Sequence, residues 1–577
     1  MTAKSVAFGR RLLARRSIRL LLASVFYLVC IVVFFEHNLP TFTTSLMGPP
    51  EDNMQDLWNT WYSQQLTSFD PRDWFFTDRL CYPEGASLSH HSFSYPNLAL
   101  IRIARWLLDL PATIPILVGA NNIVLLASFY FSTIAAYLLA YHLTRHFWAA
   151  MLGGYIFAFS PFHFAHSLHH TGLSTIQYIP LFVLCVLRLE ETRRVYYGMG
   201  AVLWFLLSAL STWYYLVYDG FFLVFLYLYR AVQARKVFIR PLLLRLGAIL
   251  AASLLILSPL LVPMIQTSLN NPNTYMEGNK ANVADLAGLF SPHPYHMAAS
   301  YFSWIHKHLK GGPWESSVYL GIVNIGLLAW AWRRHRDDAL LRWGMCGMLF
   351  FMLLAGGRFL RILGVGIPVL LPTGILEHIP LFGIARAPGR AMVYTYLFLG
   401  LAVARIMQII LTQQQMADSN ASEPKRWRVL LPIALCVGIV LDFTSINRES
   451  TPVVCAPAYT AISKGDLSAG VLNLPMTYGV GNLAMMYQMC VDRPVVHASI
   501  SRKLEETLSD KLRSVDVAEW KSLLKSAGVE YIVFHSSQNI HFLWNAREKF
   551  PPPDLREIQD HFTLVYRDKT ESLFRVD

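Results

Sequence analysis

The sequence has few charged residues and few cysteines. Asp, Glu, Lys and Arg make up 15% of its 577 residues, whereas soluble proteins carry about 25%. Its seven cysteines include no CxxC pair. It also has no internal repeat and no low-complexity tract. These absences exclude a soluble globule of this size, a disulfide-rich secreted scaffold, collagen, a coiled coil and a disordered chain.

Familiar nucleotide and zinc motifs are also missing. The sequence contains no GxxxxGK[ST], no GxGxxG before a helix and no HExxH, so nucleotide-driven transport and Rossmann chemistry have no support. The few ionisable residues within apolar segments, Asp219, Arg405 and Asp442, lie toward the segment ends. No proton or ion relay at the middle of a membrane is therefore predicted.

Apolar and aromatic residues dominate the composition. They reach 54% and 13% of the chain, with 15 Trp and 27 Tyr, which is typical of a polytopic membrane protein. About eleven segments are apolar enough to be spans, at 18–35, 120–143, 147–160, 175–189, 197–211, 214–230, 242–264, 317–333, 341–356, 391–412 and 429–444. The apolar stretch 359–376 is broken by two Pro and three Gly and is interpreted as a re-entrant or interfacial piece.

The formal net charge of +12 comes from basic tracts between the apolar segments. Alternation of the spans places these tracts, near 188–194, 230–245, 333–342 and 425–428, on one side, and the acidic loop 37–97 on the other. By the positive-inside rule we expect the N-terminus in the cytoplasm and the C-terminal part outside. The first apolar segment is followed by no cleavage pattern, so we expect it to be retained. The expected location is the inner (plasma) membrane, without a nucleic-acid partner.

The composition changes near residue 446. Charged residues return, and short strands are predicted at 471–474, 531–534, 562–566 and 573–576, with a helix over 515–527. The sequence thus predicts a transmembrane domain over 1–445 and a small extracytoplasmic α/β domain over 446–577. Cys455 and Cys490 lie outside the apolar segments and can form a disulfide.

Two adjacent acids in the first outer loop, Glu51 and Asp52, are the first candidate site. Met54, Leu57 and Trp58 follow at helical spacing, so an interfacial helix is predicted to begin near Asp52. Asp52 or Asn53 can be its N-cap. Alternatively, a carboxylate here can deprotonate an acceptor hydroxyl or bind a divalent ion.

Histidines and aromatics form a second candidate group on the outer side. His163, His166 and His170 share a helical face at i, i+3 and i+7, a spacing that can bind a phosphate or a metal. Because no carboxylate or Cys is close in sequence, the metal interpretation is disfavoured. His90 is a further candidate, with a solvated loop position as the alternative. Trp213 and Tyr214 are interpreted as an interfacial belt or a sugar-stacking surface.

The last candidate site residues are charged residues next to predicted spans in the second half of the chain. Arg386 and Arg390 precede the tenth apolar segment on the outer side, where the positive-inside rule disfavours arginine. Two such arginines indicate a phosphate partner, or they snorkel to lipid headgroups. Glu315 lies just before another apolar segment.

The whole arrangement resembles the GT-C superfamily of membrane glycosyltransferases, in its bacterial branch with a C-terminal extracytoplasmic domain. The resemblance covers essentially the full chain and rests on the order of several short motifs. They are Glu51-Asp52-Asn53, Asp56–Trp61, Tyr82–Gly85, Phe159–His166 with His169 and His170, Gln177–Pro180, Ser211–Tyr215, Arg386–Arg390, Leu474-Pro475, Tyr487-Gln488 and Arg493-Pro494.

The resemblance implies a glycosyltransferase that uses a polyprenyl-phosphate sugar outside the cytoplasm, with inversion. It implies that a first-loop acid, Asp52 or Glu51, is the general base or a metal ligand. The branch commonly has Gly before the Asp, and Glu51 stands there in this sequence. Arg386, Arg390 and the His163/His166 cluster would stabilise the lipid phosphate. A divalent cation such as Mg²⁺ or Mn²⁺ is required by some relatives and not by others.

Two other functions stay open at the level of the sequence. A transporter or flippase for lipid-linked sugars agrees with eleven spans but not with the lack of repeats and midplane charges. A non-catalytic envelope assembly protein would bind partners through residues 446–577. The acceptor can be a lipid, a glycan or a protein.

Overall fold

The computed structural model describes most of the chain and divides it into two compact units. Described residues are 16–66, 74–271, 282–311, 313–316, 318–376, 387–419, 426–464, 466–536 and 553–577. The first unit, here the helical unit, comprises 1–39, 124–258 and 275–448. The second, here the mixed unit, comprises 40–123, 259–274 and 449–577. Each unit is described by itself.

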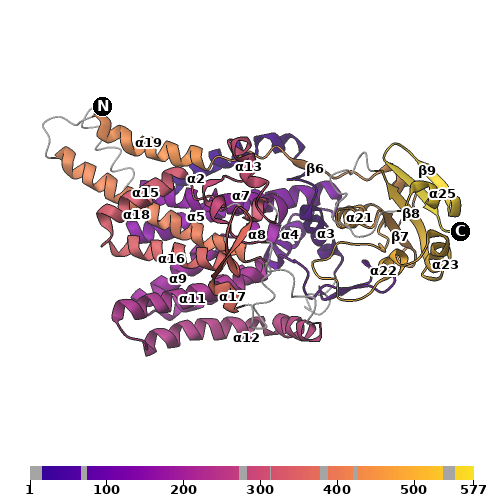
Figure 1. Ribbon diagram of the computed structural model, residues 1–577, viewed down its shortest axis with the longest axis horizontal. Helices are drawn as coiled ribbons and strands as arrows, with labels where there is room; N and C mark the ends of the chain where they lie inside the picture. Colours follow the sequence, from indigo (N-terminus) through magenta and orange to yellow (C-terminus); the bar gives the residue numbers. More distant parts are fainter. Residues whose placement is uncertain are drawn as a thin grey trace. The chain divides into compact units, whose positions relative to one another are not determined.

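The helical unit is built from long apolar helices, several of which run alongside one another in Figure 1. Its longer helices are α2 (Arg16–Phe35), α5 (Ile114–Thr144, shared with the mixed unit), α6 (Phe147–Ala158), α7 (Pro161–His169), α9 (Tyr178–Thr192), α10 (Val195–Ser211), α11 (Trp213–Ala234), α12 (Arg240–Asn270, also shared), α15 (Ile322–His335), α16 (Ala339–Ala355), α18 (Met392–Ser419) and α19 (Arg426–Asp442). Its short elements are η1 (Glu36–Thr41), α8 (Thr171–Ser174), η5 (Leu286–Phe290), η6 (Ala299–Phe302), α13 (Ser303–His306), α14 (Pro313–Ser316), α17 (Pro372–Leu376) and η8 (Pro388–Ala391).

Every one of the eleven predicted apolar segments contains a helix. Among the described residues, six helical stretches are long and apolar enough to cross a membrane: Ser17–Thr41, Ile114–Thr144, Thr171–Thr192, Trp213–Ala234, Arg240–Asn270 and Pro388–Gln414. Helices α6, α10 and α16 and residues Leu430–Asp442 are apolar but shorter. The chain is thus a multi-pass membrane protein, and the count of eleven spans stays a prediction.

Close helix packing depends on glycine at one crossing. A Cβ atom on Gly153 of α6 would lie 3.0 Å from the Gly400 carbonyl oxygen, and a Cβ on Gly400 of α18 would lie 2.7 Å from the Gly153 carbonyl oxygen. Small residues at helix crossings let backbones approach in membranes, where dispersion contacts replace the hydrophobic effect. The two glycines therefore fix how closely α6 and α18 pack.

The apolar stretch at 359–376 forms a hairpin and a short helix. Strand β4 (Phe359–Ile362) pairs with β5 (Val365–Leu370) in antiparallel fashion, and Leu363 and Gly364 have positive φ at the turn. Buried Asp285 accepts hydrogen bonds from the Leu363 and Gly364 amides, at 3.0 and 2.7 Å. The glycines and prolines that interrupt this stretch thus favour a hairpin over a helix.

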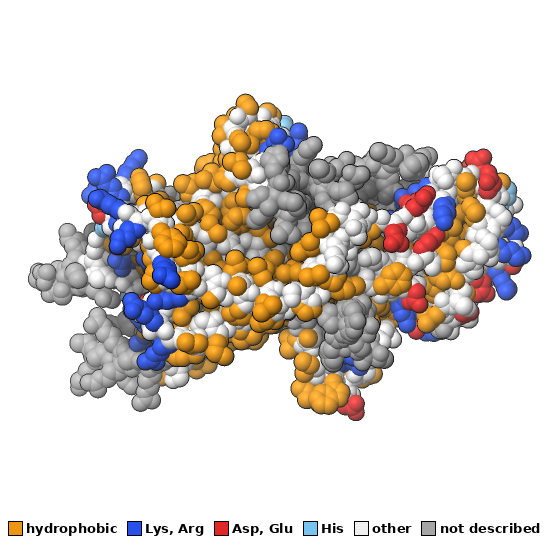
Figure 2. Space-filling view, turned by 90° about the horizontal axis from the view of Figure 1, so that it is seen from below, with side chains coloured by type: hydrophobic (Ala, Val, Ile, Leu, Met, Phe, Trp, Pro, Cys, Tyr) orange, Lys and Arg blue, Asp and Glu red, His pale blue; other side chains and the backbone are white. Residues whose placement is uncertain are grey.

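Basic side chains gather at one end of the helical unit, beside a broad hydrophobic surface (Figure 2). The turn between α9 and α10 contains Arg193 and Arg194, and the last turn of α15 contains Arg333 and Arg334. This clustering agrees with the sequence pattern used to predict orientation. The cytoplasmic placement of that end stays a prediction.

The mixed unit has a four-stranded sheet as its largest regular structure (Figure 1). Its strand order is β7-β8-β10-β9; β7 and β8 are parallel, and the other pairs are antiparallel. The strands are β7 (Gly470–Leu474), β8 (Val529–His535), β9 (Thr563–Arg567) and β10 (Glu571–Arg575), and the helices are α3 (Asp52–Gln65), α4 (Tyr95–Leu107), α20 (Pro457–Thr460), α21 (Tyr478–Val491), α22 (Leu508–Arg513), α23 (Val517–Ser526) and α25 (Leu555–His561). Two small ladders pair β1 (Ser45–Met47) with β6 (Ser450–Pro452), and β2 (Phe76–Thr77) with β3 (Ala86–Ser87).

Strands β7, β8 and β10 contribute buried side chains to a core on each face of the sheet. Leu472, Ile532 and Phe574 pack on one side with α22, α23 and α25, whereas Val471 and Val533 pack on the other with α20 and α21. Side chains alternate between faces along a strand, so apolar residues at successive positions serve two cores. The four predicted strands and the predicted helix are confirmed, and their status as a separate domain stays a prediction.

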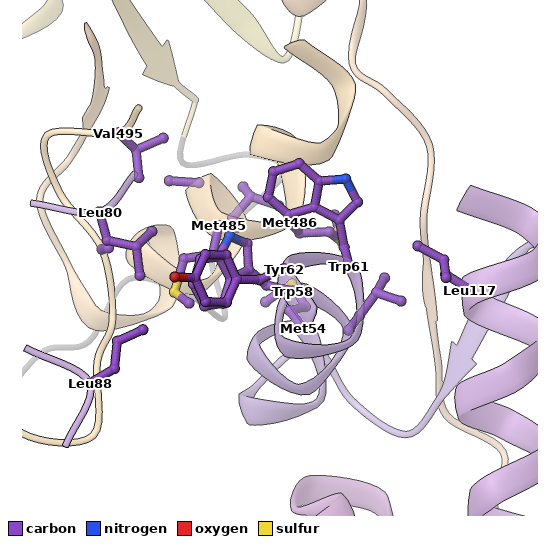
Figure 3. Packing of buried hydrophobic residues seen from close by; sticks show 14 of the residues in the cluster. Met54, Trp58, Trp61, Tyr62, Leu80, Leu88, Leu117, Met485, Met486 and Val495 are labelled. Carbon is purple, nitrogen blue, oxygen red and sulfur yellow. The ribbon is translucent and has the colours of Figure 1, made fainter. Parts of the chain in front are cut away.

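The helix predicted to begin near Asp52 is confirmed as α3, but its apolar face is not free for a membrane. Met54, Trp58, Trp61 and Tyr62 are buried in a cluster to which α21 contributes Met485 and Met486 (Figure 3). Trp58 also donates a 2.6 Å hydrogen bond to the Gln488 side chain. The expectation of an interfacial helix is therefore wrong for this face, because residues more than 400 positions away cover it.

Cys455 and Cys490 form a disulfide that closes a 35-residue separation. We predict that Cys455→Ser lowers the free energy of unfolding by about 3–4 kcal/mol, because the bridge restricts the unfolded chain. Thermal unfolding of the purified protein, with and without reductant, measures this. Cys81→Ser, at a buried unpaired cysteine, is the control; equal sensitivity of the two variants to reductant would contradict the prediction.

Candidate functional site

The first candidate group lies at the N-terminus of α3, in the mixed unit. The helix begins at Asp52 after Gly48-Pro49-Pro50, and Glu51 is the N-cap residue without a side-chain capping bond. The side chain of Asn53 instead accepts a 3.1 Å hydrogen bond from the Glu51 amide. The interpretation of Asp52 or Asn53 as a simple N-cap is therefore wrong. An acid in the first turn is still favoured by the helix dipole.

The Asp52 carboxylate faces a residue from the C-terminal part of the chain. The Tyr478 hydroxyl donates a 2.7 Å hydrogen bond to Asp52 Oδ1. Asp52 is half-buried and Tyr478 is 46% exposed, so water and polar molecules reach this pair. A carboxylate that is both oriented by a hydrogen bond and accessible can accept a proton from a bound hydroxyl.

Amide and hydroxyl groups extend from Asp52 along the same helix. Gln55 Oε1 accepts a 3.2 Å hydrogen bond from the Ser92 hydroxyl, and Gln55 Nε2 donates to the Ser499 carbonyl. The backbone amide of Ser92 also donates to Ser501 Oγ at 3.2 Å. Segments from α3, the first loop and residues 499–501 thus converge in one polar network within the mixed unit.

The two adjacent histidines of the first loop are packed rather than solvated. Burial lowers the pKa of His91 to about 4, so its neutral ring donates through Nε2 to Asn59 Oδ1 at 2.8 Å. Burial lowers the pKa of His90 to about 4 as well, and its ring nitrogens lie 3.1 Å from the Ser89 and Ser268 hydroxyls. Both rings are therefore neutral at pH 7 and hold the loop in place.

The second candidate group is a buried ion pair in the helical unit. Arg390 Nε donates to Glu315 Oε1 at 3.0 Å, and Arg390 Nη2 donates to the same oxygen. The Glu315 side chain is 4% exposed and that of Arg390 is 12% exposed. Burial alone would raise the pKa of Glu315, but the Arg390 charge and the hydrogen bond from His166 hold it well below its usual range. Glu315 is therefore ionised.

Two of the predicted histidines belong to this ion pair. His166 Nε2 lies 3.2 Å from Glu315 Oε2, and its Nδ1 lies 2.8 Å from the Phe162 carbonyl oxygen. His170 Nε2 lies 3.4 Å from Arg390 Nη2. The Tyr214 ring covers the guanidinium, whose carbon is 4.7 Å from the ring centroid, in a cation–π contact. The pair is thus enclosed by imidazole and phenol rings.

Helix α11 positions the segment that carries Arg390. The Tyr218 hydroxyl donates to the Ala387 carbonyl at 3.2 Å, and the Tyr394 hydroxyl donates to buried Asp219 Oδ1 at 2.6 Å. Together with the Tyr214 contact, these bonds fix residues before, at and after Arg390. Tyr214, Tyr218 and Asp219 of α11 therefore hold η8 and the start of α18 in place.

The other predicted site residues lie apart from the ion pair, and one of them is not among the described residues. His163 is fully buried, stacks on Phe129 at 4.1 Å, and has ring nitrogens near the Ala158 and Ser174 carbonyls. Burial lowers its pKa to about 4, so it supports α7 as a neutral ring. Trp213 is the first, half-buried residue of α11. Arg386 lies outside the described residues.

The sequence did not indicate the partners of these residues. Glu315 lies 75 positions from Arg390, and Tyr478 lies 426 positions from Asp52. Tyr478 and Gln55 carry no motif of their own. The only sequence signal for Glu315 is its position as an isolated acid next to an apolar segment. Such an acid needs a partner, but the sequence does not show which residue that is.

A metal site needs several donor side chains that converge on one point. Among the residues that the structure describes, no group of three or more His, Cys, Asp or Glu is placed to bind a metal ion. Asp52 and Glu51 are adjacent, but Asp52 Oδ1 already accepts from Tyr478. His166 and Glu315 are engaged with Arg390 and a backbone carbonyl. Neither candidate group therefore supplies three protein ligands among the described residues, and Asp52 and Glu51 offer two carboxylates at most.

Comparisons with known proteins identify a family and a fold. A family model described as "Domain of unknown function (DUF6311)" matches residues 13–439. No protein of curated function matches the sequence. Among solved structures, the apo oligosaccharyltransferase of Archaeoglobus fulgidus is similar at 12% identity with a TM-score of 0.55, over 95% of this chain and 73% of that chain.

Two further structures are similar over almost the whole chain. The arabinofuranosyltransferase AftD from Mycobacteria matches at 13% identity with a TM-score of 0.56, over 96% of this chain and 40% of AftD. ArnT from Cupriavidus metallidurans matches at 13% identity with a TM-score of 0.47, over 97% of this chain and 98% of ArnT. The predicted GT-C fold is confirmed.

Proposed function

The chain belongs to the DUF6311 family and has the GT-C fold, and on these premises we propose that it is a membrane glycosyltransferase. The observation that carries the proposal is the fold likeness over 95% or more of this chain to an oligosaccharyltransferase and an arabinofuranosyltransferase. Function does not follow from fold alone. The proposal therefore also needs reactive groups, and Asp52 and Arg390 with their neighbours are the residues whose roles are to be tested.

In the proposed reaction, Asp52 is the general base. The acceptor hydroxyl loses its proton to Asp52, its oxygen bonds to the anomeric carbon, and the bond from that carbon to the phosphate oxygen breaks. Attack opposite to the leaving group inverts the anomeric configuration. The half-exposed carboxylate and its 2.7 Å bond from Tyr478 support this role, which is expected to contribute about 10²–10⁴ in rate. Glu51, one residue earlier, is the helper or the alternative base.

The proposed leaving group is a polyprenyl phosphate, which gains negative charge as the bond breaks. Arg390 and His170 are proposed to stabilise that charge, with His166, Glu315 and Tyr214 positioning the guanidinium. Their burial supports the role, because charge stabilisation is stronger where water is excluded. His90 and His163 are assigned to support of their segments, Trp213 stays a candidate for the donor lipid, and Arg386 stays a candidate cation for the same phosphate.

The proposed partners are a polyprenyl-phosphate-linked sugar, an acceptor outside the cytoplasm, and membrane lipids. The enzyme is proposed to lie in the inner membrane with its N-terminus in the cytoplasm and residues 446–577 outside. Divalent-cation dependence stays a prediction, with Asp52 and Glu51 as candidate ligands. Comparing transfer in EDTA with transfer after Mg²⁺ or Mn²⁺ is restored tests it.

Consumption of the donor lipid tests the proposal most simply. Purified protein is reconstituted in vesicles with the lipid-linked sugars and envelope glycans extracted from its own cells, and lipids are followed by mass spectrometry. A transferase releases polyprenyl phosphate as the lipid-linked sugar disappears. An intact donor that only changes leaflet would indicate a flippase, and an intact donor that stays in place would indicate an assembly protein; either result overturns the proposal.

Removing the Tyr478 hydroxyl tests how much its bond to Asp52 matters. We predict that Tyr478→Phe slows transfer roughly 2- to 13-fold, since one hydrogen bond contributes about 0.5–1.5 kcal/mol. Initial rates of donor consumption measure the effect. Tyr566→Phe, which removes a hydroxyl bonded to Asp568, is the matched control and leaves the rate unchanged. An unchanged rate in Tyr478→Phe would remove this hydroxyl from the mechanism.

A further inference from the structure

Helix α4 (Tyr95–Leu107) presents an apolar face that no described residue covers. Leu100, Ile103, Trp106 and Leu107 are 57%, 50%, 78% and 67% exposed. Their spacing of i, i+3, i+6 and i+7 places them on one side of the helix. An exposed apolar stripe of this kind marks an interaction surface.

The opposite side of α4 is what attaches it to the mixed unit. Asn97, Leu98 and Ile101 are buried. The helix therefore divides into a docked side and a free side. The free side continues past the end of the helix, where Leu108 and Leu110 are 67% and 40% exposed.

The two arginines of α4 do not contribute charge to the free face. Arg102 Nη2 donates to the Leu66 carbonyl at 2.6 Å, where α3 has just ended. Arg105 Nη1 donates to Gln64 Oε1 at 3.0 Å, and its Nε donates to the Leu110 carbonyl at 3.1 Å. Both guanidinium groups are thus engaged with the polar end of α3 and with the following turn. The free face keeps only apolar side chains.

The chain itself holds this face close to the membrane. Helix α4 ends at Leu107, and the membrane-spanning helix α5 begins at Ile114. Six residues separate them, so the helix end lies at most about 25 Å from the start of the span. Residues 95–107 and the start of α5 belong to the same unit.

We propose that α4 lies in the outer interface of the bilayer, with Leu100, Ile103, Trp106 and Leu107 in contact with lipid. Interfacial helices immerse such a face about 5–10 Å into the boundary between headgroups and acyl chains. Tryptophan is favoured at that depth. On the helix itself this face carries one polar group, the Trp106 indole N–H, and the exposed Asp109 follows the helix end. So apolar a face fits acyl chains better than a protein partner, whose interface has a polar rim. Contact with lipid also anchors the first loop independently of any transfer reaction.

Photo-crosslinking tests which occupant covers the face. The full chain is produced with p-benzoylphenylalanine at the position of Leu107, reconstituted in vesicles of phosphatidylethanolamine and phosphatidylglycerol, and irradiated. Adducts are identified by mass spectrometry. Position 255 of α12, 74% exposed in a predicted span, is the lipid control, and Lys521 of α23, exposed in the mixed unit, is the aqueous control.

A lipid adduct at position 107 is expected, with a yield near that at position 255 and roughly tenfold above that at position 521. A crosslink to a second copy of the chain, or a yield no higher than at position 521, would overturn the proposal. An unchanged elution volume in size-exclusion chromatography shows that each labelled protein is folded. Because the readout is lipid contact, a failure here is separate from a failure of the proposed transferase activity.

Discussion

Arg390→Gln lowers the free energy of unfolding by about 3–5 kcal/mol, because it leaves the ionised, buried Glu315 without its counter-charge. Glu315→Gln is expected to have a similar effect on the uncompensated arginine. The double variant Arg390→Gln/Glu315→Gln recovers most of the loss, since two neutral amides replace both charges. Thermal or denaturant unfolding in detergent gives the three values, and their difference is the coupling energy.

Arg405→Gln is the matched control for this cycle. Arg405 also pairs with a carboxylate, Asp338, but the two side chains are 28% and 18% exposed. A partly solvated pair contributes about 1 kcal/mol or less. If Arg390→Gln were no more damaging than Arg405→Gln, or the double variant no more stable than either single variant, the pair would not be the structural element described above.

The double variant also separates stability from catalysis. It is expected to be folded and to retain little transfer activity, because it lacks the cation proposed for the leaving phosphate. Donor consumption at equal amounts of folded protein measures this. Full activity in the double variant would remove Arg390 from the proposed chemistry while leaving its structural role intact.

Asp52→Asn reduces transfer by about 10²–10⁴-fold, since an amide cannot accept the acceptor proton. The fold is expected to persist, because Asp52 is half-buried and is not the N-cap of α3. Initial rates with saturating donor give the loss in kcat. Abundance in the membrane and the unfolding temperature are measured alongside.

Two neighbours provide the controls for Asp52. Asp56→Asn changes an acid one turn further along α3 and is expected to leave transfer unchanged. Glu51→Gln distinguishes the two candidate bases. If Glu51→Gln abolished transfer and Asp52→Asn did not, the role of base would pass to Glu51; if neither affected it, the first-loop acids would have no part in the reaction.

Local sequence patterns predicted much of the architecture. Val471 and Val533 alternate with Leu472 and Ile532, and the structure confirms strands at those positions. The helix starting at Asp52 was also predictable from its spacing. Periodicity reports which residues share a face, but not what covers that face. The spacing alone therefore predicts an interfacial helix, whereas α21 buries the apolar side of α3.

The side-chain pairs within each candidate group could not be predicted either, because local patterns do not report which distant residues meet. From the sequence, Arg390 is a candidate to bind a phosphate or to snorkel to lipid headgroups, and nothing links it to its buried partner Glu315. Tyr478 had no signal that linked it to Asp52. Contacts between positions far apart in sequence depend on tertiary packing, which a single sequence does not encode in any local pattern. The disulfide between Cys455 and Cys490 can be predicted from the sequence, because few cysteines lie outside the apolar segments.

The most direct test of the central claim compares lipid-linked sugars and envelope glycans, by mass spectrometry, in cells that express the native protein or Asp52→Asn at equal membrane abundance. The account predicts that the variant loses one glycan and accumulates the polyprenyl-phosphate sugar that supplies it. Identical profiles, in cells where deletion of the whole protein changes the glycans, would contradict the assignment of Asp52 as the base of a glycosyltransferase.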